Sequence, residues 1–172
     1  MDLRQNKPPA SPEHSRRIIG VDPGLAASGW GVIDFDHQRI RYIAHGCIET
    51  KADRPRSERL FSIYDRFRTL LEAYHPSEGA IETLYFSKNV SSAIPVAEAR
   101  GVLCMSLAER GLPVREFTPN AIKQAVVGRG TADKAQVQDL VRLILGLPSI
   151  PTPHHAADAL GVAVCCAHTI LV

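Results

Sequence analysis

Runs of apolar residues and segments with helical spacing alternate along this chain, and together they predict an α/β domain. The first apolar run, at Arg17–Val21, predicts a buried strand that ends just before Asp22. Two more runs, Trp30–Phe35 and Ile40–Ile48, follow after short segments rich in turn-forming residues. Because successive strands joined by short turns pair with each other, these three segments are expected to form an antiparallel meander.

Helical spacing marks the segments between the later strands. Leu60, Ile63, Phe67 and Leu70 recur every three or four positions, which predicts an amphipathic helix over 56–74. Three strands in meander followed by alternating helices and strands predict one five-stranded mixed sheet flanked by helices. Turn and capping signals place the remaining elements at strand 79–82, helix 91–110, strand 114–117, a helix capped by Thr118, helix 133–145 and helix 155–170.

Composition is that of an ordinary globular protein. The 172 residues are 45% hydrophobic, which suffices for one domain, expected over 16–172. Residues 1–15 are polar and carry several prolines, so we expect a disordered leader. The four cysteines form no C-x-x-C pair and are expected to be reduced core thiols. With no apolar segment of membrane-spanning length and no signal peptide, the sequence predicts a cytoplasmic protein.

Three carboxylates and a histidine lie where the predicted elements would bring them together. Asp22 and Glu82 end strands, and His155 and Asp158 lie three residues apart on one face of the last helix. Each has an alternative explanation alone, since Asp22 precedes a Pro-Gly turn and a lone carboxylate often forms an ion pair. His154 also competes with His155 for any role. Their combination, in this order, is more specific than any member.

Small residues around Asp158 favour such a convergence. Ala156, Ala157, Ala159 and Gly161 would let the last helix approach the sheet closely. Carboxylate oxygens and an imidazole nitrogen then form a ligand set for divalent cations. Two such ions about 3.5–4 Å apart can stabilise the attacking and leaving oxygens of a phosphodiester.

These motifs, in this order and spacing, resemble the RuvC family of Holliday junction resolvases. The likeness extends from about Arg17 to His168, nearly the whole chain. The segments that carry it are Ile19–Gly24, Ala80–Glu82, Ala99–Val102, Val126–Gly128 and Ala156–Leu160.

The resemblance implies a ribonuclease H-like fold and a homodimer that resolves four-way DNA junctions. Its activity would be metal-dependent nicking of two strands symmetrically, leaving 5′-phosphate and 3′-hydroxyl ends, in recombination and repair alongside a RuvA–RuvB branch-migration complex. The family's catalytic acids fall on Asp22, Glu82 and Asp158, and its fourth catalytic position falls on His155. Many members carry Asp at that position and some carry His.

The histidine changes the expected metal preference. A neutral imidazole at position 155 removes one negative charge from a site for two Mg²⁺ or Mn²⁺ ions. Imidazole suits Mn²⁺ better than Mg²⁺, which prefers oxygen ligands. We therefore expect Mn²⁺ to be favoured.

Aromatic and basic residues outside this cluster are candidate DNA contacts. Two aromatics beside a lysine after Glu82 could stack on unpaired bases, although core packing explains the second aromatic equally well. Two lysines match basic residues that the family uses near the scissile phosphate, although a solvated helix face is the commoner place for lysine. Because the net charge is only +2, DNA binding requires clustered cations. The candidates are Tyr85, Phe86, Lys88, Lys123, Arg129 and Lys134.

Three alternatives remain open at the level of sequence. A YqgF-like nuclease would keep the fold and act on RNA. An ATP-binding protein of the actin–sugar kinase class also begins with a strand, Asp-x-Gly and a glycine-rich hairpin, but it needs a second comparable domain. A junction-binding structural protein would not require Asp22, Glu82 and Asp158 together. Helix 91–110, rich in Ala, Val and Leu, is the candidate dimer contact.

Overall fold

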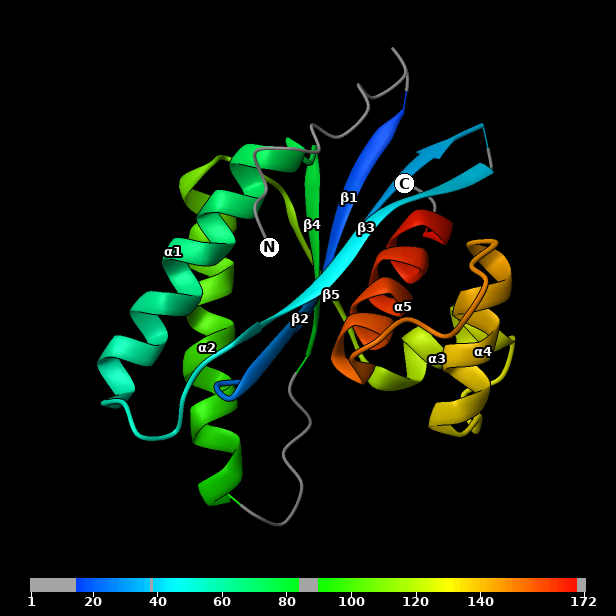
Figure 1. Cartoon of the computed structure of the whole chain (residues 1–172). Helices are drawn as coiled ribbons and strands as arrows, with labels where there is room; N and C mark the ends of the chain where they lie inside the picture. The colour runs from blue at the N-terminus through cyan, green and yellow to red at the C-terminus, as the bar shows by residue number, and fades with distance from the viewer. Residues whose placement is uncertain (1–14, 38, 84–89, 170–172) are drawn as a thin grey trace.

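A five-stranded sheet in the order β3-β2-β1-β4-β5 forms the centre of the domain (Figure 1). The computed structural model describes residues 15–37, 39–83 and 90–169. The first three strands pair antiparallel, whereas β4 runs parallel to β1 and β5 parallel to β4. The predicted mixed sheet is therefore confirmed. Its strands are β1 (Arg16–Asp22), β2 (Ala27–Asp36), β3 (Arg39–Glu49), β4 (Glu78–Glu82) and β5 (Val114–Phe117).

Helices cover both faces of the sheet, two on one side and three on the other (Figure 1). Within the described residues, no helix is both long and apolar enough to cross a bilayer. Thr118 caps α3 by accepting a hydrogen bond from the Ala121 amide, as its position in the sequence predicts. The first face carries α1 (Arg56–Tyr74) and α2 (Val90–Glu109), and the second carries α3 (Pro119–Val127), α4 (Lys134–Ile144) and α5 (His154–His168).

One expectation about α2 is wrong. The sequence suggests that Pro95 lies in the first turn of its helix, where a missing N–H costs least. The helix begins at Val90, so Pro95 lies inside it, in the second turn. There the proline ring removes an intrahelical hydrogen bond.

Side chains of β1 alternate between two cores because successive residues of a strand point to opposite faces. Ile18 packs with Leu160 and other residues of α3, α4 and α5. Ile19 and Val21 pack with Phe67 and other residues of α1 and α2. By the same alternation Asp22, the last residue of β1, lies on the face of Ile18, where α5 packs against the sheet.

Two glycines let α5 lie directly against the sheet. A Cβ atom at Gly20 would collide with the carbonyl oxygen of Ala159, and one at Gly29 would collide with that of His155. Helix α5 is consequently buried along most of its length, from Ala156 to Ala167. The first turns of α5 therefore lie against the end of β1 and the start of β2, as the run of small residues predicts.

Buried ion pairs occupy the opposite end of the sheet. Arg17 of β1 donates to both carboxylate oxygens of Asp34, at 2.7 and 3.0 Å, and Arg41 adds a bond of 2.7 Å. Burial alone would raise the pKa of Asp34, but hydrogen bonds from Arg17 and Arg41 outweigh it and lower the pKa. Glu78 is held similarly by Arg16 and Arg115.

The four cysteines are free, as expected, but only two belong to the core. Cys165 and Cys166 are buried on α5, and burial raises their pKa values to about 11 and about 12. Cys104 is partly buried and packs against the α1–α2 core, whereas Cys47 is partly buried and belongs to neither core, so its assignment to the core is wrong. High pKa values keep the core thiols protonated and unreactive.

Candidate active site

Asp22 and Glu82 end two neighbouring parallel strands at the same edge of the sheet. Asp22 is the last residue of β1, Glu82 is the last residue of β4, and the two strands are hydrogen-bonded in register. Because parallel strands end on the same side, both carboxylates face a common cavity of about 410 Å³. His155 and Asp158 of α5 line the same cavity.

Three of these four side chains lie in direct proximity. The Nδ1 atom of His155 is 2.7 Å from Oδ2 of Asp22. Asp22, His155 and Asp158 each offer one ligand atom, and these atoms all lie within 4.8 Å of one another. Glu82 shares the cavity but stands outside this tight group. The geometry thus brings together all four residues that the sequence singles out, three of them closely.

The predicted DNA-binding residues have different outcomes. Lys123 and Lys134 line the cavity, and the Lys134 ammonium is 2.6 Å from a carboxylate oxygen of Asp158. Arg129 is exposed between α3 and α4 and does not line the cavity. The other three candidates, Tyr85, Phe86 and Lys88, lie outside the described residues.

Gln138 is a site residue that the sequence reasoning missed. Its side-chain amide, only 4% exposed, donates to Asp158 at 3.1 Å through Nε2. Its Oε1 atom is 3.3 Å from Nδ1 of His154. One sequence feature could have revealed it, since Gln138 is a polar residue on the inward, apolar face of α4 beside Val137 and Val141. Gln138 holds the Asp158 carboxylate in one orientation.

The site accumulates more negative charge than its own cations offset. Burial, together with the nearby charges of Asp22 and Asp158, raises the pKa of Glu82 to about 7. Burial also raises the pKa of Asp22, against the lowering effect of the hydrogen bond to His155. Like charges at a desolvated site favour protonation or a bound cation.

The donor set fits a hard divalent cation. Carboxylate oxygens of Asp22, Glu82 and Asp158 and a ring nitrogen of His155 are the ligands available in the cavity. Oxygen-rich sets of this kind suit Mg²⁺ and Mn²⁺, and no cysteine lines the cavity to favour a thiolate metal site.

Known proteins resemble this chain over nearly its whole length. The family profile described as "Crossover junction endodeoxyribonuclease RuvC" matches residues 18–166. A protein of that name from Chloroflexus aurantiacus is 48% identical over 153 residues, covering 89% of this chain and 93% of that relative.

Solved structures give the same result. The RuvC structure of Thermus thermophilus is 33% identical, covers 87% of this chain and 92% of that one, and superposes with a TM-score of 0.80. The same protein in complex with a Holliday junction substrate is 31% identical over 87% of this chain and 91% of that one, with a TM-score of 0.79. The expected ribonuclease H-like fold is thereby confirmed. The chain belongs to the RuvC family of crossover junction endodeoxyribonucleases.

Proposed function

We propose that this protein resolves four-way DNA junctions by hydrolysing one phosphodiester in each of two symmetrically related strands, leaving 5′-phosphate and 3′-hydroxyl ends. The observation that carries the proposal is the group of Asp22, His155 and Asp158, with ligand atoms within 4.8 Å of one another at the mouth of a cavity shared with Glu82. The resemblance to a structure solved with a Holliday junction substrate supports the choice of DNA.

The four residues Asp22, Glu82, His155 and Asp158 act as the cation ligands. Two bound divalent cations supply Lewis acidity for activating water and stabilising the leaving oxygen. Gln138 keeps the Asp158 carboxylate directed into the cavity through its 3.1 Å hydrogen bond. The ammonium groups of Lys123 and Lys134 line the same wall and offset the charge of an incoming phosphate.

His155 sets the metal preference. An imidazole nitrogen in place of a carboxylate oxygen favours Mn²⁺ over Mg²⁺. Titrating the two ions calorimetrically against DNA-free protein should give tighter binding of Mn²⁺, and His155→Asp should narrow the difference. Equal affinities in the wild type would remove the argument for this preference.

A homodimer would supply two identical sites for two symmetric nicks. Four exposed residues of α2 form a stripe at helical spacing, namely Ile94, Gly101, Met105 and Ala108. Ile94 and Met105 are 49% and 56% exposed, and a Cβ at Gly101 would meet nothing within 4 Å. Such an uncovered apolar stripe suits packing against its symmetry mate. Met105→Arg should yield monomers in sedimentation experiments, whereas Leu143→Arg on α4, also exposed, should not.

Other expected contacts belong to the same proposal. Tyr85, Phe86 and Lys88 are the candidates for contact with unpaired bases, and Arg129 for contact with phosphate. We also propose cooperation with a RuvA–RuvB branch-migration complex and a cytoplasmic location.

The decisive experiment compares substrates and variants. Wild-type protein with Mg²⁺ or Mn²⁺ is expected to nick a four-way junction far faster than linear duplex or RNA of matched sequence. Asp22→Asn should bind the junction and fail to nick it, while Asp139→Asn, on the α4 surface, should behave as wild type. Preferred cleavage of RNA, or equal nicking by wild type and Asp22→Asn, would refute the proposal.

A further inference from the structure

Cations without a carboxylate partner are concentrated at the catalytic end of the sheet. Most arginines in the described part of the chain form ion pairs with Asp or Glu. Among the lysines and arginines that form no ion pair within the described residues, Lys123 and Arg129 are already candidate DNA contacts. Three others, Lys51, Arg59 and Arg66, lie at or near the corner between β3 and α1.

This corner lies at the same end of the sheet as the catalytic residues. Strand β3 is antiparallel to β2, which is antiparallel to β1, so β3 ends on the side where β1 and β4 end (Figure 1). Thr50, just after β3, is tied to the turn that follows Asp22. Its amide donates to the Ala26 carbonyl at 3.0 Å, and its hydroxyl donates to the Leu25 carbonyl at 2.6 Å.

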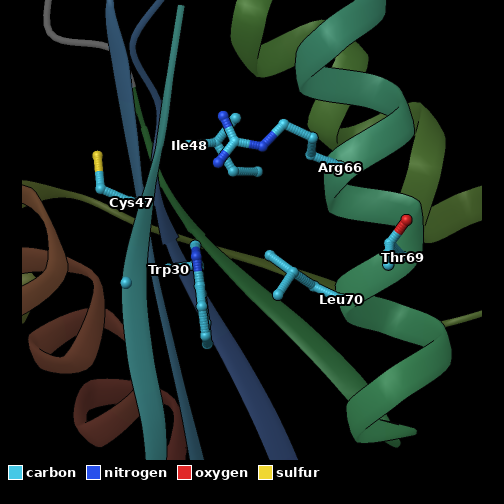
Figure 2. A pocket seen from close by; sticks show the side chains of 7 residues that line it. Trp30, Cys47, Ile48, Arg66, Thr69 and Leu70 are labelled. Carbon is cyan, nitrogen blue, oxygen red and sulfur yellow. The ribbon is translucent and has the colours of Figure 1, made fainter. Parts of the chain in front are cut away.

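Two arginines of α1 hold the corner in place. Arg59 donates through Nε to the Thr50 hydroxyl at 2.8 Å. Arg66 extends from α1 across Ile48, as Figure 2 shows, and donates through Nη1 to the Glu49 carbonyl at 3.0 Å. A guanidinium anchored through Nε keeps its terminal N–H groups available for an anion, in a fixed direction.

The corner also forms a hollow. A cavity of about 260 Å³ lies between the end of β3 and the first turns of α1. Three cations line it, Lys51, Arg54 and Arg59, against the two carboxylates Glu49 and Glu58. Arg54 is 3.7 Å from Glu58, and Glu49 offsets one charge of the remaining cations, Lys51 and Arg59, so the lining keeps a net charge of +1. The hollow is therefore polar, positively charged and open to solvent.

We propose that this corner cleft, formed by Thr50, Lys51, Arg54 and Arg59, binds the phosphate backbone of the DNA that the enzyme cuts. The bound DNA then crosses the catalytic edge of the sheet, with Lys123 and Lys134 on the side of α3 and α4 and the corner cleft on the side of α1. The cleft adds affinity and fixes the direction of the strand without touching the scissile bond. This inference rests on the proposed function, since it takes DNA as the ligand.

The test compares DNA binding by variants that lose cations in the cleft with binding by a variant that loses one at the other end of β3. Lys51→Gln/Arg59→Gln is compared with Arg39→Gln, which removes an exposed cation with no carboxylate partner in the described residues at the other end of β3. Binding to a four-way junction is measured by filter retention without divalent metal over a range of salt concentrations. The double variant should bind on the order of tenfold more weakly, and its log–log salt slope should fall by about 2, one per lost phosphate contact. Arg39→Gln should match wild type.

The outcomes separate the cleft from the nuclease activity. The proposal that the cleft binds DNA would be overturned by an unchanged affinity and salt slope in the double variant. An equal loss of affinity in Arg39→Gln would also overturn it. If the wild-type protein binds the four-way junction and fails to nick it, the proposed function is wrong. The comparison of DNA affinities still tests whether the cleft binds DNA. Lys51→Glu alone serves if Arg59→Gln disturbs folding, because Lys51 is exposed and makes no side-chain hydrogen bond in the described structure.

Discussion

Buried carboxylates at the two ends of the sheet have different neighbouring cations, and their pKa values are shifted in opposite directions. At the end where β1 starts, Asp34 is only 2% exposed and is held by Arg17 and Arg41. At the end where β1 stops, Asp22 and Glu82 share a cavity in which Lys134 contacts Asp158 instead. The pKa of Asp34 is lowered by its arginines, whereas burial raises the pKa values of Asp22 and Glu82.

This difference distinguishes carboxylates that form ion pairs within the fold from carboxylates that are available to bind a cation. A buried anion needs compensating charge, and at Asp34 the chain supplies it from its own arginines. At Asp22 and Glu82 the compensation is incomplete, so the free protein carries unfavourable charge that an external cation can relieve. The following predictions test this contrast, beginning with the largest effect.

Replacing Asp34 should cost the most stability. Asp34→Asn removes the carboxylate charge that accepts from the buried Arg17 guanidinium, for which we expect a loss of about 3–5 kcal/mol in the free energy of unfolding. Urea denaturation measures it. Asp36→Asn, two residues along β2 and more exposed, should change the free energy by less than about 0.5 kcal/mol. If Asp34→Asn lowers the free energy of unfolding by less than about 1 kcal/mol, Asp34 does not stabilise the fold as proposed.

Glu82→Gln should do the reverse, lowering activity while sparing the fold. Losing a cation ligand should slow junction nicking by on the order of 10²–10³-fold, equivalent to about 3–4 kcal/mol in the activation barrier. Single-turnover kinetics measures the rate. The metal-free variant should be as stable as wild type or more so, because a like charge has been removed from the group. A variant that unfolds more easily than wild type would argue that Glu82 belongs with the structural carboxylates.

Gln138→Leu should have an intermediate effect through Asp158. Without the hydrogen bond to Asp158, we expect Mn²⁺ affinity to fall about 10–100-fold, the range for residues that orient metal ligands. Calorimetric titration of the DNA-free protein measures this affinity independently of nicking. Gln136→Leu on the same helix removes an amide from the N-terminal capping box and should leave Mn²⁺ affinity unchanged. Equal affinities in wild type and Gln138→Leu would show that Asp158 needs no such support.

The pH dependence of stability should have opposite signs at the two ends. The folded pKa of Glu82, about 7, exceeds the unfolded value of about 4.3. Protonation therefore favours folding, and this contribution to stability grows as pH falls from about 8 toward 5 and is lost as pH rises through 7. The folded pKa of Asp34 is below the unfolded value of about 3.9, so its contribution is present above that pH and is lost in stronger acid.

Urea midpoints of metal-free protein, measured from strong acid to about pH 8, report both trends. Glu82→Gln should flatten the curve between pH 5 and 8 and leave the acid limb unchanged. If Glu82→Gln and wild type have parallel curves from pH 5 to 8, the raised pKa of Glu82 is refuted.

The sequence predicts the catalytic group because each member lies on an element with a clear pattern. Asp22 and Glu82 end apolar runs, and the His-x-x-Asp spacing places two side chains on one helical face. The meander and the parallel β4 then follow from ordinary connection rules. The sequence pattern does not predict the 2.7 Å distance between Nδ1 of His155 and Oδ2 of Asp22, because this distance depends on how α5 packs against Gly29.

The residues that escaped prediction depend on tertiary packing. Gln138 reaches Asp158 only because Val137 and Val141 of α4 pack near Gly161 of α5. Arg17 pairs with Asp34 because the strand register places them opposite each other, and that register depends on the length of the turn between β1 and β2. The corner cleft joins residues of a loop and a helix through Thr50, a contact that no local spacing encodes.

Trp30 is the single tryptophan of the chain, and its place in the fold has a practical consequence. The indole is 6% exposed, stacks over Gly46 and lies 5.5 Å from the ring of Tyr74. It shares a hollow of about 200 Å³ with Arg66, the arginine that holds the end of β3 (Figure 2). The single indole fluorophore of the protein therefore lies beside the corner between β3 and α1. A change in its fluorescence emission would report DNA binding at that corner without an added label.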